Sequence, residues 1–197
     1  MIVEHGGAPV YVWRSDTPWL ALSSGVLGGG FGPRSWVLNA TVSHAYERLD
    51  PAAHLAEIAE ALGLSGTGVG LMTAVDVHEV EHREDSGVRV AVTTGIGAHP
   101  TWAAGRSAEP APVGTINAVC WLPVRLAPAA LVNVVATVAE AKAQALFESG
   151  VPGTGTPTDS VTVLCPPDGV EEPFGGPRSP VGGAVARAVH GAIRARL

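Results

Sequence analysis

The chain contains 197 residues with a formal net charge of −6, and its 12 lysines and arginines are spread thinly along it. This length can bury one sizeable core, and the basic residues form no stripe that would hold a phosphate backbone. The composition therefore predicts one domain over residues 1–197 and excludes nucleic acid as a partner.

The two cysteines and the first residues bear on the compartment. Cys120 and Cys165 each lie in an apolar, strand-like run, and thiols in such runs without a secretory signal favour reduced residues over a disulfide. Residues 1–12 lack the basic-then-apolar layout of a signal peptide. No apolar run approaches the ~20 residues of a membrane helix. We expect a cytoplasmic protein with no membrane partner.

Seven segments show the period-two pattern and β-branched content that are typical of strands. They are residues 10–13, 19–23, 36–38, 75–82, 88–94, 116–124 and 161–165. The glycine-rich residues 25–32 follow a strand but have no helix after them, so they do not fit the context of a phosphate-binding loop.

Three helices are predicted from their ends and their apolar periodicity. The first follows Asp50 as N-cap and Pro51 as a first-turn residue, and ends at Gly63. The second begins at Pro128 and ends at Gly150, and the third covers about residues 181–196. In the second helix Glu140 and Lys142 interrupt an apolar sequence, so we expect one of them to face inward.

The fold class follows from how these segments alternate. Residues 84–87, Glu-Asp-Ser-Gly, form a turn between two strand patterns, which makes that pair antiparallel. Helices and strands do not alternate strictly. We predict an α+β fold: a single domain with a mixed, largely antiparallel sheet covered by about three helices. We detect no internal repeat.

The sequence His78-Glu79-Val80-Glu81-His82 matches a pattern of zinc peptidases. That pattern binds zinc only on a helix, where residues four apart share a face, whereas on a strand they stand ~13 Å apart. The surrounding valines favour a strand with charged, solvated side chains. We therefore expect no metal here, and a zinc peptidase through these residues stays an alternative.

Polar residues gather where several predicted strands begin or end. Thr115 and Asn117 alternate onto one side at the start of a strand, where they either satisfy the local turn or point into a pocket. Asp159 follows a Gly-Thr-rich turn and either caps backbone amides or projects a carboxylate into a cleft. The other members of this set are Ser23, Ser24, Asn39, Thr93, Thr94, His99, Thr154, Thr156 and Thr158.

These strand ends have the chemistry that a large ligand edged with amides needs. His99 is the histidine among them, and an imidazole beside loop hydroxyls serves either as an acid or base or as a hydrogen-bonded structural residue.

With these motifs in order, the sequence resembles the adenosylcobinamide amidohydrolase family of corrinoid salvage across nearly its whole length. The motifs that carry the resemblance are Ser23-Ser24 with the glycines after them, Asn39, Gly70-Leu71-Met72-Thr73-Ala74, Thr93-Thr94-Gly95, Gly114-Thr115-Ile116-Asn117, Glu140-Ala141-Lys142, residues 154–159, and Ser179 with Gly182. The chain departs from the family at His99-Pro100, where an Asn-Ala pair is usual.

The resemblance implies hydrolysis of the amide that joins aminopropanol to the corrin ring, giving adenosylcobyric acid. For this reaction our hypothesis makes Asp159 or Glu140 the base, lets Asn117 and the backbone of Gly114 and Thr115 bind the oxyanion, and gives Lys142 charge stabilisation. The residues expected to bind substrate are Ser23, Ser24, Asn39, Thr73, Thr94, His99, Thr154, Thr156 and Thr158.

Several expectations accompany this reading. The protein needs no cofactor of its own, because the corrinoid cobalt belongs to the substrate, and an oligomer is possible. A covalent route through Thr115 after cleavage of the Gly114–Thr115 bond stays open. A corrinoid-binding protein without catalysis is the other alternative to the zinc peptidase.

Overall fold

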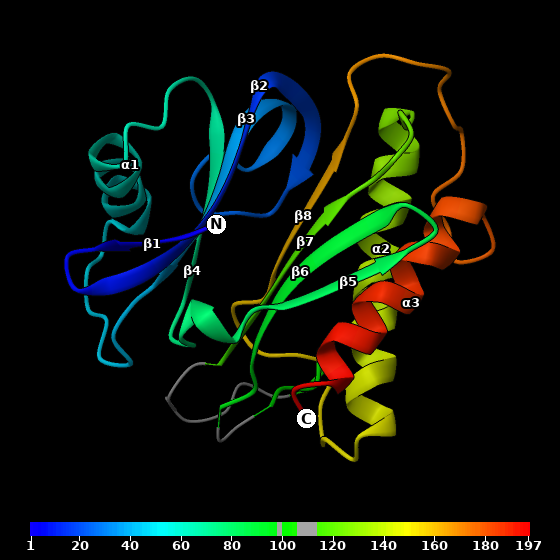
Figure 1. Cartoon of the computed structure of the whole chain (residues 1–197). Helices are drawn as coiled ribbons and strands as arrows, with labels where there is room; N and C mark the ends of the chain where they lie inside the picture. Colours follow the sequence, from blue (N-terminus) through cyan, green and yellow to red (C-terminus); the bar gives the residue numbers. More distant parts are fainter. Residues whose placement is uncertain (98–99, 106–113) are drawn as a thin grey trace.

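The computed structural model describes residues 1–97, 100–105 and 114–197 (Figure 1). The elements follow the chain in the order β1 (Ile2–His5), β2 (Ala8–Ser23), β3 (Gly30–Thr41), α1 (Pro51–Ala61), β4 (Gly68–Thr73), the 3₁₀ turn η1 (Val77–Glu79), β5 (Glu81–Asp85), β6 (Val88–Gly95), β7 (Thr115–Trp121), α2 (Pro128–Glu148), β8 (Ser160–Cys165) and α3 (Pro180–Arg194).

The strands form one eight-stranded sheet in the order β4-β3-β2-β8-β7-β6-β5, with β1 paired to β2. The pairs β3–β4 and β7–β8 are parallel, and each is joined by a helical crossover. The described pairs of strands that remain are antiparallel. The predicted α+β class, with a mixed and largely antiparallel sheet and three helices, is confirmed.

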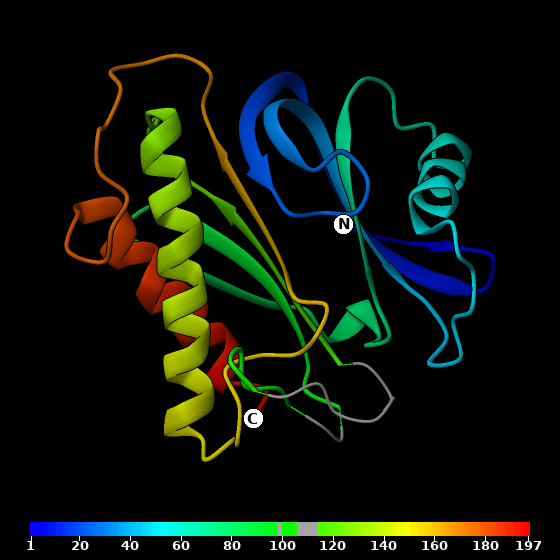
Figure 2. The ribbon, with the colours of Figure 1, turned by 180° about the vertical axis from the view of Figure 1, so that it is seen from behind.

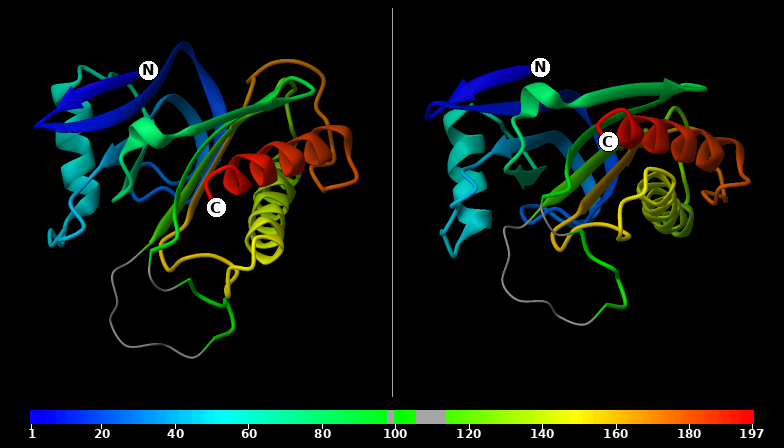
Figure 3. Two further views of the ribbon diagram at one scale, coloured as in Figure 1. Left: turned by 60° about the horizontal axis from the view of Figure 1, so that its bottom comes forward. Right: turned by 90° about the horizontal axis from the view of Figure 1, so that it is seen from below.

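The sheet is strongly bent, and the helices lie on its outer side (Figure 3). Helix α1 packs on Val10, Val12 and Leu38 in the half built from β1 to β4. Helices α2 and α3 lie across β6, β7 and β8 in the other half (Figure 2). Inside the bend, the two halves pack against each other through a second core. Its members include Ala21, Val37, Val69, Leu71, Ala91 and Val119.

Strand β2 corrects one prediction, because residues 10–13 and 19–23 belong to a single strand of 16 residues. Its register with β3 shifts between Arg14 and Trp19. Pro18, which cannot donate to a ladder, lies in this stretch where the pairing with β3 is interrupted.

Strands β1 and β4 were not predicted. In β4 the glycines hid the pattern, and Gly68 is needed there because a Cβ at this position would overlap the ring of Trp36.

Residues 75–82 do not form the predicted strand. Residues Val77–Glu79 make one 3₁₀ turn that Asp76 caps by accepting from His78 N at 2.9 Å, and only Glu81 and His82 enter β5. The carboxylate of Asp76 also contacts His78 Nδ1 at 2.8 Å. The two histidines therefore share no helical face. Across the residues that the structure describes, no group of three or more His, Cys, Asp or Glu side chains is placed to hold a metal ion.

The three helices form where their proline and glycine end residues predict them. Two details of the predictions are corrected. Asp50 precedes α1, but its side chain caps no backbone amide. It pairs with Arg48 instead, at 2.8 and 2.9 Å. Helix α2 has the length and apolar composition of a membrane span, contrary to expectation, and 44% of its most apolar window is buried. Its residues Leu131, Val134 and Val138 pack into the core against the sheet and α3, so this composition also fits a core helix.

The chain also contains an internal repeat that sequence inspection missed. The series β1-β2-β3-α1-β4 and β5-β6-β7-α2-β8 have the same order and the same pairing directions. Short motifs recur at matching places: Ala21-Leu22-Ser23-Ser24-Gly25 with Ala91-Val92-Thr93-Thr94-Gly95, Asn39-Ala40 with Asn117-Ala118, and residues 48–53 (RLDPAA) with residues 125–130 (RLAPAA). The two halves meet where β2 pairs with β8.

Candidate functional site

A cavity of about 560 Å³ lies where the two halves of the sheet meet. Its walls come from the loop after β2, the segment between β3 and α1, the end of β4, and the entries to β7 and β8. The polar residues that line it are Ser24, Ser43, His44, Tyr46, Arg48, Thr73, Thr115, Asn117, Thr158, Asp159 and Ser160. The predicted convergence of polar strand ends therefore occurs here.

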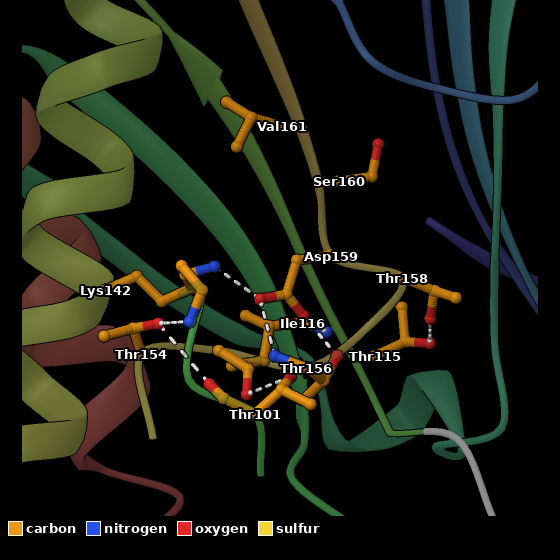
Figure 4. A network of polar contacts seen from close by, with 12 residues as sticks. Thr101, Thr115, Ile116, Lys142, Thr154, Thr156, Thr158, Asp159, Ser160 and Val161 are labelled. Atoms are coloured by element: carbon orange, nitrogen blue, oxygen red, sulfur yellow. Dashed lines mark hydrogen bonds and ion pairs between the residues drawn. The ribbon is translucent and has the colours of Figure 1, made fainter. Parts of the chain in front are cut away.

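Asp159 is the centre of a polar network at the entry to β8 (Figure 4). One carboxylate oxygen accepts from Ile116 N at 2.9 Å and from the Thr156 hydroxyl, and the other accepts from Thr156 N at 3.0 Å and from Lys142 Nζ. The side chains of Lys142 and Asp159 are 18% and 11% exposed. Lys142 is thus the inward-facing member of its pair, and it ties α2 to β7 and β8.

Gly155 passes directly beside this ion pair. A Cβ at Gly155 would overlap both the Asp159 carboxylate and Lys142 Nζ. The turn is also fixed to the segment around Thr101, since Thr101 N donates to Gly155 O and Thr154 N donates to Thr101 O, each at 2.8 Å. The backbone of this Gly-Thr turn therefore lies against the ion pair.

Two pairs of hydroxyls face the cavity. The hydroxyls of Thr115 and Thr158 are 2.6 Å apart, and Thr158 donates to Gly114 O at 3.0 Å. Because Thr158 has one proton, Thr115 is the donor between them. The hydroxyls of Ser24 and Ser160 are 3.0 Å apart, and Ser24 Oγ also accepts from Val161 N at 3.0 Å.

Beneath these hydroxyls lies a buried chain of amide groups. Asn117 Nδ2 donates to Asn39 Oδ1 at 3.0 Å and to Met72 O at 2.8 Å. Asn39 Nδ2 donates to Thr93 Oγ1 at 3.1 Å. Asn39, Thr93 and Asn117 are buried, so their hydrogen bonds fix the inner wall.

The structure separates the predicted residues into groups. Ser24, Thr73, Thr115, Asn117, Thr158 and Asp159 line the cavity. Ser23 and Asn39 lie behind it, with the Ser23 hydroxyl 2.8 Å from that of Thr162. Lys142 and Thr156 bind Asp159, whereas the Thr154 hydroxyl accepts from Ala103 N at 3.0 Å.

Two predicted residues stand apart from the cavity walls. Glu140 is exposed on α2 and does not line the cavity. Thr94 alternates with Thr93 along β6 and so points to the opposite side of the sheet; its hydroxyl is buried without a partner in the described part of the chain. His99 lies outside the described residues.

Sequence reasoning missed the segment between β3 and α1. His44, Tyr46 and Arg48 line the cavity. The Tyr46 ring stacks on His54 with centroids 5.6 Å apart, and Arg48 binds both Asp50 and Glu57. The polar run from Ser43 to Arg48, directly before a helix start, was the available signal.

The electrostatics of this segment follow from those contacts. Hydrogen bonds from Arg48 lower the pKa of Glu57 and of Asp50, and the same contacts raise the pKa of Arg48. Arg48 therefore enters the cavity wall as a cation whose charge is already balanced by two carboxylates.

The family model for adenosylcobinamide amidohydrolases matches residues 2–197. A curated adenosylcobinamide amidohydrolase of Methanosarcina mazei is 30% identical over 186 residues, which cover 90% of this chain and 89% of that protein. One of Halobacterium salinarum is 45% identical over 91 residues, which cover 46% of this chain and 38% of that longer protein. The match spans both halves of the sheet and every wall of the cavity, so the chain belongs to the adenosylcobinamide amidohydrolase family.

Proposed function

We propose that this protein hydrolyses the amide that joins aminopropanol to the corrin side chain of adenosylcobinamide, giving adenosylcobyric acid for corrinoid salvage. Family membership over residues 2–197 carries this proposal. The cavity supports it, because hydroxyl, amide and carboxylate groups converge in about 560 Å³. Such a volume suits an amide-bearing arm of the substrate, with the macrocycle outside.

Amide hydrolysis adds the oxygen of water to the carbonyl carbon, and the water's proton reaches the departing nitrogen. It needs a base, donors for the developing oxyanion and a proton for the amine. Asp159 is the carboxylate that lines the cavity among the described residues, whereas Glu140 faces solvent. We therefore give the base role to Asp159 and leave Glu140 out of the site.

This role sets a condition on the ion pair. The Asp159 carboxylate has four acceptor positions, and all four hold donors: Ile116 N, Thr156 N, the Thr156 hydroxyl and Lys142 Nζ. One donor must move before Asp159 binds a proton from water. Lys142 is the flexible member, since its ammonium sits on a four-carbon stem, and it would then meet the negative charge that develops in the cavity.

The direct test is to incubate the purified protein with adenosylcobinamide and to follow the release of aminopropanol and the appearance of adenosylcobyric acid by mass. We expect both products in equal amounts. Tight binding of the corrinoid without turnover would contradict the proposal and would favour a corrinoid-binding protein.

A further inference from the structure

The polarity of the buried amide chain is fixed by one backbone atom. Met72 O can only accept a hydrogen bond, so the Asn117 atom 2.8 Å from it is Nδ2. The Asn39 atom 3.0 Å from that same nitrogen must then be Oδ1. Asn39 therefore turns its own Nδ2 to Thr93 Oγ1, 3.1 Å away. Neither amide can be reversed without placing two donors or two acceptors together.

The same contacts use both donors of the Asn117 side chain. A side-chain amide carries two N–H groups, and those of Asn117 go to Asn39 Oδ1 and Met72 O. No N–H remains to bind an oxyanion. The free atom of this side chain is its oxygen, which is an acceptor.

That oxygen remains accessible. Among the described residues no donor reaches Asn117 Oδ1. The fully buried side-chain polar atoms that lack a partner there are Thr94 Oγ1, Trp121 Nε1 and Arg125 Nε. Asn117 Oδ1 is not one of them, so this oxygen is at least partly exposed. Asn117 also lines the cavity, although only 2% of its surface is exposed. The exposed part therefore includes an acceptor directed at whatever occupies the cavity.

From these contacts we infer that Asn117 Oδ1 accepts the N–H of the scissile amide, and that Asn39 is the positioning residue that holds Asn117 in this orientation. The inference rests on the proposed function and deepens it, because it makes Asn117 a determinant of amide specificity and not a donor to the oxyanion. Carboxylic esters lack this N–H, so the same acceptor would face an ester oxygen and disfavour it.

The test compares two substrates and three variants. The substrates are adenosylcobinamide and its ester analogue, in which oxygen replaces the scissile N–H. The variants are Asn117→Ala, Asn39→Ala, and Asn133→Ala as control, because Asn133 is exposed on α2 away from the cavity. The readout is the ratio of kcat/KM for the amide to kcat/KM for the ester. The intrinsic reactivities of the two substrates are the same for every variant, so a change in this ratio between variants reports the protein's preference alone.

We expect Asn117→Ala to lower this ratio at least ~10-fold, mainly through loss of the amide reaction, and the control to leave it unchanged. Asn39→Ala should also lower this ratio, because the variant keeps the Asn117 side chain but removes the residue that orients it. This second variant tests the inference even if Asn117→Ala folds poorly. An equal loss on both substrates would overturn the inference, since an oxyanion forms from either one. A wild-type protein that cleaves neither substrate would sink the proposed function itself, and the inference with it.

Discussion

Asn39 and Asn117 occupy the same position in the two repeats, and Asn117 donates to Asn39 across the junction at 3.0 Å. Equivalent residues meet here, but their surroundings differ. Asn39 donates to Thr93, whereas Asn117 donates to Met72 O and borders the cavity. Two copies of one unit thus produce a single cavity whose walls come from both halves.

The ion pair of Lys142 and Asp159 should respond to charge removal in a characteristic way. Lys142→Met leaves a mostly buried carboxylate without its cation, so we expect a loss of roughly 3 kcal/mol in the free energy of unfolding. The double variant Lys142→Met with Asp159→Asn removes both charges and should recover part of that loss. Urea unfolding of the two proteins measures the difference, and a double variant less stable than the single one would contradict this account.

Substitutions of Asp159 and of Glu140, the two carboxylates first considered for the base, should have very different effects on hydrolytic activity. Asp159→Asn should lower kcat by ~100-fold or more, because the cavity loses its carboxylate. Glu140→Gln should stay within about twofold of wild type, since an exposed side chain away from the site contributes little. Steady-state hydrolysis of adenosylcobinamide by both variants decides between them. Strong loss in the Glu140 variant would return that residue to the mechanism.

Gly155 provides a test of close packing at the site. Gly155→Ala places a methyl group against the Asp159 carboxylate and Lys142 Nζ, so we expect the ion pair to be displaced and both activity and thermal stability to fall. Gly176→Ala is the matched control, because a Cβ there meets nothing within 4 Å. Similar melting temperatures for the two variants would show that the turn can move aside.

The pair of Asp85 and Arg187 links the β5–β6 turn to α3, and its contribution should depend on pH. Hydrogen bonds from Arg187 lower the pKa of Asp85 from 3.8 to about 2. A carboxyl whose pKa is depressed on folding stabilises the protein above its unfolded pKa, and this contribution disappears as the pH falls through the folded pKa. The melting temperature of wild type should exceed that of Asp85→Asn above pH ~4, and the difference should shrink toward pH 2. A difference independent of pH in this window would show that the ion pair is not its source.

Much of the fold could be read from local signals. Proline and glycine mark the ends of α1, α2 and α3, and the Asp85-Ser86-Gly87 turn gives the β5–β6 hairpin, with Ser86 and Gly87 at positive φ. Strand β4 could not be predicted this way, because Gly68 and Gly70 reflect contacts with Trp36 and Leu55 that exist only after folding. The repeat was hidden by an unequal spacing, since Gly25 and Asn39 are fourteen residues apart while Gly95 and Asn117 are twenty-two apart.

The candidate site was predictable in composition but not in arrangement. Thr115, Asn117, Thr158 and Asp159 were chosen as polar residues at strand ends, and all of them line the cavity. The pairing of Lys142 with Asp159 depends on how α2 crosses the sheet, which the sequence does not state. His44 escaped notice because the polar run from Ser43 to Arg48 that precedes α1 is also typical of a solvated surface loop.

Strand β2 joins both halves of the sheet, since its first part pairs with β1 and β3 and its last four residues pair with β8. This hydrogen-bonded pairing holds the two halves together in addition to residues 74–80, the segment that connects β4 to β5. We therefore expect the two walls of the cavity to keep their spacing when a corrinoid arrives. The specificity for one amide over another would then depend on a cavity shape already present in the free protein. The turnover rate would depend on local movements of side chains.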